Sequence, residues 1–262
     1  MTTKTILITG ATDGLGRALA HDLARQGHTL LLHGRSQRRL DEVAKALPTT
    51  VRTYRADFSS LAEVREMTDA LLAAEPRIDV LIANAGIGGG PRRESIDGYE
   101  LNFAVNYLAQ YLLITQLRER LEASARARVV LVSSIGQAPV DFDDVMLEDR
   151  YDGMRAYCQS KLAQVAFGIR LARTTDPANV TVTSLHPASE MPTKMVGRRD
   201  GEPISLGVAT TARLALDPTL EGVTGLFFDR QRPAAPHPWA LNFAVQEHLW
   251  TVSEQFVGRF SG

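Results

Sequence analysis

The sequence alternates short, continuously apolar runs with longer amphipathic segments, and this alternation limits the fold more than any other feature. Seven of the runs have the composition of buried strands. They cover residues 5–8, 29–32, 51–54, 79–82, 129–132, 180–183 and 225–228. Strands separated by helical segments pair in parallel through crossover connections, and strands without polar alternation are covered on both faces. The sequence therefore predicts an α/β fold with a doubly wound, about seven-stranded parallel sheet and helices on both faces.

The composition fits one globular domain spanning residues 1–262. Hydrophobic residues make up 44% of the chain, enough for a large core, and the formal net charge is −1. Such a balanced charge gives no general attraction to nucleic acid or to an anionic membrane. The single cysteine, Cys158, rules out an intramolecular disulfide, and the six scattered histidines lack the spacing of metal ligands. The sequence contains no recognisable signal peptide or membrane-spanning run, so we expect a cytoplasmic protein.

Three stretches lack a regular pattern: residues 136–154, residues 187–205 and the proline-rich residues 232–238. The first two follow the fifth and sixth predicted strands, at the edge where open α/β sheets bind ligands. We expect residues 188–205 to form a lid over a substrate pocket. The lid contains the apolar side chains of Met191, Met195 and Val196, which favour an apolar substrate.

A glycine-rich turn connects the first predicted strand to an amphipathic helix over about residues 15–26. In Rossmann-type folds, glycines at the positions of Gly10, Gly14 and Gly16 allow the tight turn, the approach of a pyrophosphate and close helix packing. The N-terminus of the helix also directs free N–H groups at the anion. A tight turn without a ligand is the alternative interpretation. The expected dinucleotide contacts are Gly10, Thr12, Asp13, Gly14, Leu15 and Gly16.

The end of the second predicted strand indicates which dinucleotide binds. NAD sites carry a carboxylate there for the ribose 2′-hydroxyl, whereas this chain reads His33-Gly34-Arg35. Because Arg35 can bind a 2′-phosphate through two donors, we expect NADP(H) to be preferred. NAD(H) stays open, with Arg35 as an ordinary surface residue. Asp57 and Phe58 follow the third strand and are expected at the adenine, although Asp57 could instead cap a turn.

Further motifs follow in a fixed order: Asn84-Ala85-Gly86, Asn106, Ser133-Ser134 and Tyr157-Cys158-Gln159-Ser160-Lys161. With the glycine turn, they make the chain resemble the short-chain dehydrogenase/reductase family over about residues 4–230. Residues 97–106 and 156–163 are most similar to the retinol-dehydrogenase-like branch, as is the long spacing between the serines and the tyrosine. The resemblance implies no retinoid specificity for this chain.

The resemblance implies a role for each matching residue. Tyr157 would pass the proton, Lys161 would hold the nicotinamide ribose, Ser134 would bind the substrate oxygen, and Asn106 would organise a proton-relay water. Ser133 is expected to be structural. The family usually has Pro-Gly where this chain has Pro-Ala at 187–188, which puts in doubt the assignment of the threonine that follows. Further expected cofactor contacts are Asn84, Ala85, Gly86, Tyr157, Lys161, Pro187 and Thr193.

Elementary electrostatics supports the pairing of Tyr157 with Lys161. Residues four apart share a helix face, so the ammonium is expected near the phenol. At about 4 Å and an effective dielectric of about 20, the charge supplies about 4 kcal/mol, or about three pK units. The sequence thus predicts a tyrosine pKa near neutrality, where proton transfer is most efficient.

These observations predict an NADP(H)-dependent oxidoreductase that interconverts an alcohol and a carbonyl in a small, apolar molecule. The alternative is an NADP(H)-binding sensor or scaffold with little turnover. The predicted helices near 103–121 and 156–173 are apolar enough to pair with a second copy, which leaves both a monomer and a homo-oligomer open. His186 is expected to be a packed strand-end residue, and Cys158 a packing residue.

Overall fold

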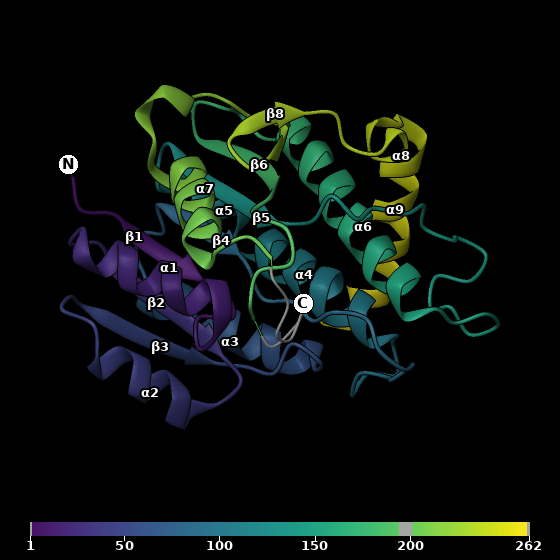
Figure 1. Cartoon of the computed structure of the whole chain (residues 1–262), viewed down its shortest axis with the longest axis horizontal. Helices are drawn as coiled ribbons and strands as arrows, with labels where there is room; N and C mark the ends of the chain where they lie inside the picture. The colour runs from purple at the N-terminus through teal and green to yellow at the C-terminus, as the bar shows by residue number, and fades with distance from the viewer. Residues whose placement is uncertain (1, 194–200, 261–262) are drawn as a thin grey trace.

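One mixed sheet forms the middle layer of the molecule, with helices on both faces (Figure 1). The structure is a computed structural model that describes residues 2–193 and 201–260. Within these residues the strand order is β3-β2-β1-β4-β5-β6-β7-β8. The strands are β1 (Thr5–Ile8), β2 (Thr29–Gly34), β3 (Val51–Arg55), β4 (Val80–Ala83), β5 (Ala127–Val132), β6 (Val180–His186), β7 (Phe227–Asp229) and β8 (Arg232–Ala234).

The predicted doubly wound parallel sheet is confirmed, with one addition at its edge. Strands β1 to β7 pair in parallel, while β8 pairs with β7 antiparallel. Strand β8 lies in the proline-rich stretch that we predicted to be irregular. Pro233 is tolerated there because an edge strand has one side free of ladder hydrogen bonds, so the missing N–H costs little.

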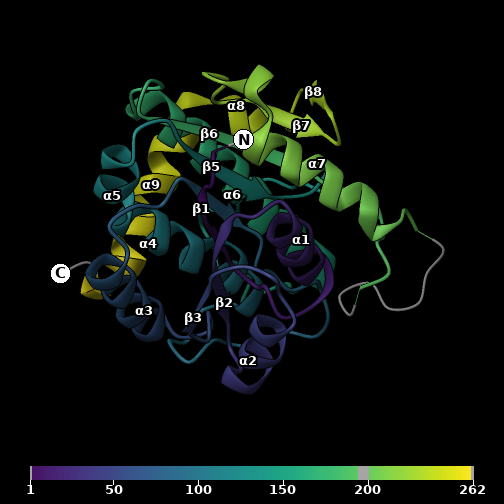
Figure 2. The same cartoon turned by 90° about the vertical axis from the view of Figure 1, so that its left-hand side faces the viewer.

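Helices lie on both faces of the sheet (Figure 2), and the sheet separates the apolar core into two layers. Along β1, Leu7 packs into the layer that includes α3, α4 and α6, whereas Ile6 and Ile8 pack into the layer of α1 and α7. Both faces of the sheet are therefore buried, as the continuous apolar runs predict. The helices are α1 (Gly14–Arg25), α2 (Gln37–Lys45), α3 (Leu61–Ala74), α4 (Ala109–Gln116), α5 (Arg118–Ala123), α6 (Gly153–Thr174), α7 (Ile204–Leu216), α8 (Pro238–Leu241) and α9 (Phe243–Val257).

A π-helical turn, Phe103–Leu108, precedes α4. The hydrophobic pattern predicted one continuous helix near 103–121, so the structure differs by dividing it into the π turn, α4 and α5. A π turn adds one residue to a helical turn, and such turns occur frequently at functional sites.

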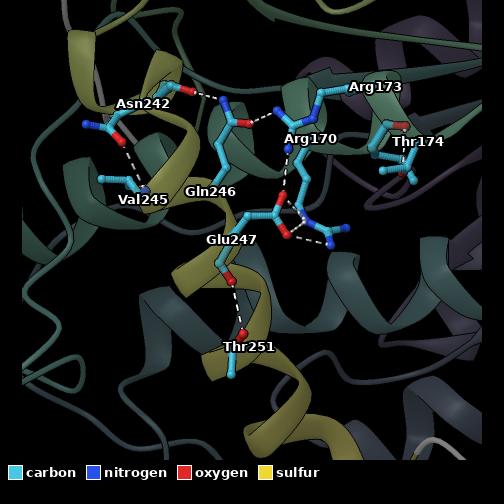
Figure 3. Close-up of polar contacts among 10 residues, drawn as sticks. Arg170, Arg173, Thr174, Asn242, Val245, Gln246, Glu247 and Thr251 are labelled. Atoms are coloured by element: carbon cyan, nitrogen blue, oxygen red, sulfur yellow. Dashed lines mark hydrogen bonds and ion pairs between the residues drawn. The ribbon is translucent and has the colours of Figure 1, made fainter.

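Helix α9 covers the face formed by α4 and α6, which the sequence left open for a second copy of the chain. The Trp250 ring of α9 lies 5.1 Å from the Tyr111 ring of α4 and 3.7 Å from the Arg170 guanidinium carbon of α6. Glu247 accepts hydrogen bonds from Arg170 and Arg173 (Figure 3). The chain thereby packs its own C-terminal helix on this face.

The strand order creates a crevice at the carboxyl edge of the sheet. The chain runs from β1 outward to β3 and then returns to form β4 beside β1. The connections after β1 and β4 therefore lead to opposite sides, and ligands bind in open α/β sheets where the connections diverge. The glycine turn follows β1 at this point, and residues 84–87 follow β4.

Candidate active site

A cavity of about 880 Å³ opens at this carboxyl edge. It is lined by residues that follow β1, β2, β3, β4, β5 and β6, together with Tyr157 and Lys161 of α6. All the site residues predicted from the sequence line it, except Gly16 and Asn106. The structure thus brings together residues that are as much as 183 positions apart along the chain, from Gly10 to Thr193.

The glycine turn has no room for side chains. A Cβ atom on Gly10, whose φ is +68°, would lie 2.9 Å from the Ala85 Cα. A Cβ atom on Gly16 would lie 2.3 Å from the Gly10 carbonyl oxygen, so Gly16 packs behind the turn and not into the cavity. Gly14 faces Thr193, whose Cγ2 would be 3.1 Å from an added Cβ. The turn therefore combines a bare backbone surface with the N-terminus of α1, the arrangement that accepts phosphate groups.

His33 stabilises this turn through hydrogen bonds to its neighbours, a role that was not predicted from the sequence. The ring is 3% exposed and stacks on Phe58 with centroids 4.0 Å apart. Gly10 N donates to Nδ1 at 3.2 Å, and Nε2 donates to the Ala56 carbonyl at 3.0 Å. Burial lowers the His33 pKa to about 4, which keeps the ring neutral. No sequence motif marks this histidine, because its partners follow β1 and β3, whereas His33 itself lies on β2.

The arginines near the second strand end differ in what they contact. Arg35 is exposed at the cavity wall just beyond β2. Arg39 lines the same cavity and lies 3.8 Å from the Asp13 carboxylate, while Arg38 pairs with Glu42. The cavity end beside Arg35 and Arg39 therefore carries two guanidinium groups.

Asp57 lines the cavity beside Phe58 and also caps a turn. Its Oδ1 accepts from Ser59 N at 3.0 Å. The capping alternative raised from the sequence is therefore present in the structure, at a position that still faces the cavity.

The loop after β4 forms the opposite wall. Asn84 donates through Nδ2 to the Thr9 carbonyl at 2.9 Å, which ties this loop to the end of β1. A Cβ atom on Gly86 would lie 3.2 Å from Asn106 Oδ1 and 3.5 Å from Lys161 Nζ. The absence of a side chain at Gly86 thus keeps the space beside the lysine open.

Asn106 lies behind this wall, in the π turn. It is fully buried, and its carboxamide accepts from Ile87 N at 2.7 Å and donates to the Ile87 carbonyl at 3.0 Å. It also donates to Ser160 Oγ on α6 at 2.9 Å. Asn106 therefore joins the β4 loop to the helix that carries Tyr157.

The two serines after β5 have different partners. Ser133 Oγ donates to the Lys161 carbonyl at 2.8 Å and holds β5 to α6. Ser134 Oγ accepts from Gly136 N at 3.0 Å, and the Ser134 hydroxyl acts to lower the pKa of Tyr157. The second serine is thus the one that influences the phenol.

Lys161 is 3% exposed, and burial lowers its pKa to about 7. Its Nζ donates to the Val132 carbonyl and to Gln164 Oε1, each at 3.0 Å, and lies 5.7 Å from the centre of the Tyr157 ring. Burial raises the Tyr157 pKa, and only the hydrogen bond to Ser134 opposes it. The predicted tyrosine pKa near neutrality is therefore wrong for this arrangement, because burial dominates and the ammonium is directed at other acceptors.

The predicted lid lies partly within the described residues. Ala188, Glu190, Met191 and Thr193 line the cavity, whereas residues 194–200, with Met195 and Val196, lie outside the described part of the chain. Helix α7 begins at Ile204, so its first two residues overlap the end of the predicted lid.

Glu202 and His186 both hydrogen-bond Ser189, near the start of this segment. Glu202 accepts from Ser189 N at 2.6 Å and forms an ion pair with Arg230 at 2.7 Å. His186, at the end of β6, is 5% exposed and bonds Ser189 Oγ at 3.0 Å. The histidine is therefore packed at the strand end, as expected, although it also borders the cavity.

Residues 2–193 and 201–260 contain neither a helix that could span a membrane nor a cluster of side chains that could hold a metal ion. None of their helices is long and apolar enough to cross a membrane. No group of three or more histidine, cysteine, aspartate or glutamate side chains in them is arranged to hold a metal ion.

Comparison with known proteins identifies the family. The short chain dehydrogenase family matches residues 4–202. Retinol dehydrogenase 13 of Mus musculus is 34% identical over 97% of this chain and 84% of its own length. Retinol dehydrogenase 14 of Homo sapiens is 35% identical over 97% of this chain and 86% of its own.

A solved structure shares the fold of this chain. The crystal structure of an uncharacterised protein from Mycobacterium Paratuberculosis superposes with a TM-score of 0.83 and 27% identity, covering 97% of this chain and 93% of that one. With a family match over most of its length and curated relatives above 30% identity, the chain belongs to the short-chain dehydrogenase family.

Proposed function

We propose that this protein is an NADP(H)-dependent oxidoreductase that interconverts an alcohol and a carbonyl. The observation that carries the proposal is the placement of Ser134, Tyr157 and Lys161 in the cavity that also holds the glycine turn. One cavity can therefore bind the phosphates of a dinucleotide and present a hydroxyl pair to a substrate oxygen. The bound nicotinamide would supply or accept the hydride, which is the chemistry of the cofactor itself.

The chain's residues fit the proposed cofactor at both ends of the cavity. The bare backbone of Gly10 and Gly14 leaves the space that a pyrophosphate requires. Arg35 and Arg39 provide guanidinium donors where a 2′-phosphate would lie, and this supports NADP(H) over NAD(H). The third Lys161 N–H has no protein partner among the described residues and would bond the nicotinamide ribose.

In the reductive direction, Tyr157 would donate its phenolic proton to the carbonyl oxygen of the substrate. Ser134, which lines the same cavity, would hold that oxygen with its hydroxyl. The raised Tyr157 pKa keeps the phenol protonated at neutral pH, which suits a proton donor. In the oxidative direction, the phenolate needs the Lys161 ammonium and the oxidised nicotinamide to be stabilised.

An apolar substrate is supported by apolar side chains that line the cavity. Ile87, Ile96 and Met191 line it, and Ile96 is 72% exposed. Large apolar side chains exposed beside a cavity are typical of binding surfaces for apolar ligands. The retinol dehydrogenases among the relatives point to the same class of alcohol.

The experiment that tests the proposal measures NADPH oxidation by the purified protein with a panel of apolar aldehydes and ketones. NADPH binding is measured in parallel by fluorescence. Turnover with apolar carbonyls and none with charged sugars is the expected result. Tight binding without turnover across the panel would instead favour the sensor or scaffold alternative.

A further inference from the structure

Gln164 contacts the proposed active-site lysine, and neither the motifs nor the proposed proton path includes it. It lies one helical turn after Lys161 on α6 and is 1% exposed. Its Oε1 accepts from Lys161 Nζ at 3.0 Å. An ammonium group can only donate, so the amide must turn its oxygen toward the lysine.

This orientation leaves the other half of the amide without a partner. Gln164 Nε2 is buried, and no hydrogen-bond acceptor reaches it among the described residues. A buried, unpaired N–H destabilises a fold, and a methionine of similar length would fill the same space without that cost. The structure thus tolerates an unfavourable group on one side of the amide while using the carbonyl on the other.

The surroundings of Lys161 explain why that carbonyl matters. Tyr157 is the titratable side chain that faces the ammonium from α6. Among residues 2–193 and 201–260, the other elements packed around it contribute neutral groups: the Val132 carbonyl from β5, Gly86 from the β4 loop and Asn106 from the π turn. Burial is the cause of the lowered lysine pKa, and no carboxylate offsets it. Among the described residues, two carbonyl oxygens therefore stabilise the charge.

We propose that Gln164 is a positioning residue that keeps Lys161 charged and directs its remaining N–H toward the cofactor side of the cavity. The two carbonyl acceptors hold two of the three donors, so the third faces the space left open at Gly86. This inference rests on the proposed function for its consequence in catalysis, but the effect on the lysine itself can be measured without turnover.

The direct test is the titration of Lys161 by NMR in protein labelled with isotopic lysine. The chain has only four lysines, namely Lys4, Lys45, Lys161 and Lys194. The Lys161 signal is therefore assigned as the one that disappears in Lys161→Arg. Two variants of nearly unchanged size change the acceptor in opposite ways: Gln164→Met removes it, and Gln164→Glu makes it anionic.

The expected shifts have opposite signs. Gln164→Met lowers the Lys161 pKa by about one unit, because the charge loses a hydrogen bond, and Gln164→Glu raises it by about one unit or more. The matched control is Gln159→Met on the same helix. Gln159 is also 1% exposed, but its amide bonds Asp141 N and the Val145 carbonyl. This control leaves the Lys161 titration unchanged, and thermal unfolding verifies that each variant is folded.

The pH profile of NADPH-dependent reduction provides the second readout. Activity that needs the charged lysine is lost as pH rises through its pKa, so the alkaline limb of kcat/KM moves down in Gln164→Met and up in Gln164→Glu. Equal Lys161 titrations in wild type and both variants, or shifts of the same sign, would overturn the role of Gln164. If one of the two variants does not fold, the other still tests the direction of its own expected shift in the Lys161 pKa. Opposite NMR shifts without turnover in the wild type would uphold the role of Gln164 and refute the proposed reaction.

Discussion

At the scale of single residues, sequence motifs predicted which side chains meet in the cavity, but not how their charges are balanced. Tyr157, Ser134 and Lys161 come together because α6 and the end of β5 are adjacent, and a motif on a known fold contains that information. The direction of the tyrosine pKa depends on burial, which the motif does not encode. His33 was missed for a similar reason, since its partners Gly10 and Ala56 become neighbours only in the folded chain.

The exposed guanidinium of Arg35 is predicted to select the phosphorylated cofactor. Replacing it with alanine should raise the KM for NADPH about tenfold or more and leave that for NADH nearly unchanged, because a charge-assisted contact to the 2′-phosphate is lost. Steady-state kinetics with both cofactors measures this. Arg38→Ala is the control, because Arg38 pairs with Glu42. Equal loss with both cofactors would argue against a 2′-phosphate contact.

His33 is predicted to make the fold sensitive to acid. Its folded pKa of about 4 lies below the ordinary 6.5, so the unfolded chain binds the extra proton first as pH falls. The stability that His33 contributes is complete above about pH 6.5 and is lost progressively down to about pH 4, with a total of about 3 kcal/mol.

Urea unfolding of wild type and His33→Leu at pH 7 and pH 4.5 checks this prediction. The wild type should lose more stability than the variant between the two pH values. His21→Leu serves as the control, because His21 lies on α1, is only half-buried and makes neither of the His33 hydrogen bonds. Parallel pH dependence in wild type and His33→Leu would contradict the assignment.

At the scale of elements, the hydrophobic pattern predicted the strands to within a few residues and located most helices. It could not predict the π turn at Phe103–Leu108, because one inserted residue hardly changes an apolar pattern that is buried on all sides. Nor did it predict that α9 covers α4 and α6. That contact depends on Trp250 and Glu247 meeting Arg170, residues about 80 positions apart.

Trp250→Ala is predicted to loosen α9. The variant should be about 2–4 kcal/mol less stable than wild type, because the ring packs on Tyr111, Phe167 and the Arg170 guanidinium. It should also form larger species, since the uncovered apolar face of α4 and α6 can then pair with another copy. Chemical unfolding and light scattering measure the two effects. Trp239→Ala, which changes the other tryptophan on α8, should have the smaller effect on both, and the reverse order would refute this account.

At the scale of the whole molecule, strand order determines where the site lies. The doubly wound topology was readable from the alternation of elements, and it places the ends of β1 and β4 at one crevice. The antiparallel β8 could not be predicted from the sequence. It lies in the proline-rich residues 232–238, and proline is tolerated only in strands at the edge of a sheet. The exposure of Ile96 at the cavity was also unpredictable, since exposure of a large side chain is a property of the folded surface.

The central claim is that Tyr157 transfers a proton while hydride passes between the nicotinamide and the substrate carbon. The most direct measurement uses NADPH deuterated at both C4 positions, with an apolar ketone, and follows the label into the alcohol in wild type and Tyr157→Phe. We predict one deuterium on the carbinol carbon of the wild-type product and a rate lower by about 10²–10⁴ in the variant, with NADPH binding retained. An unlabelled product, or equal rates in the two proteins, would contradict the account.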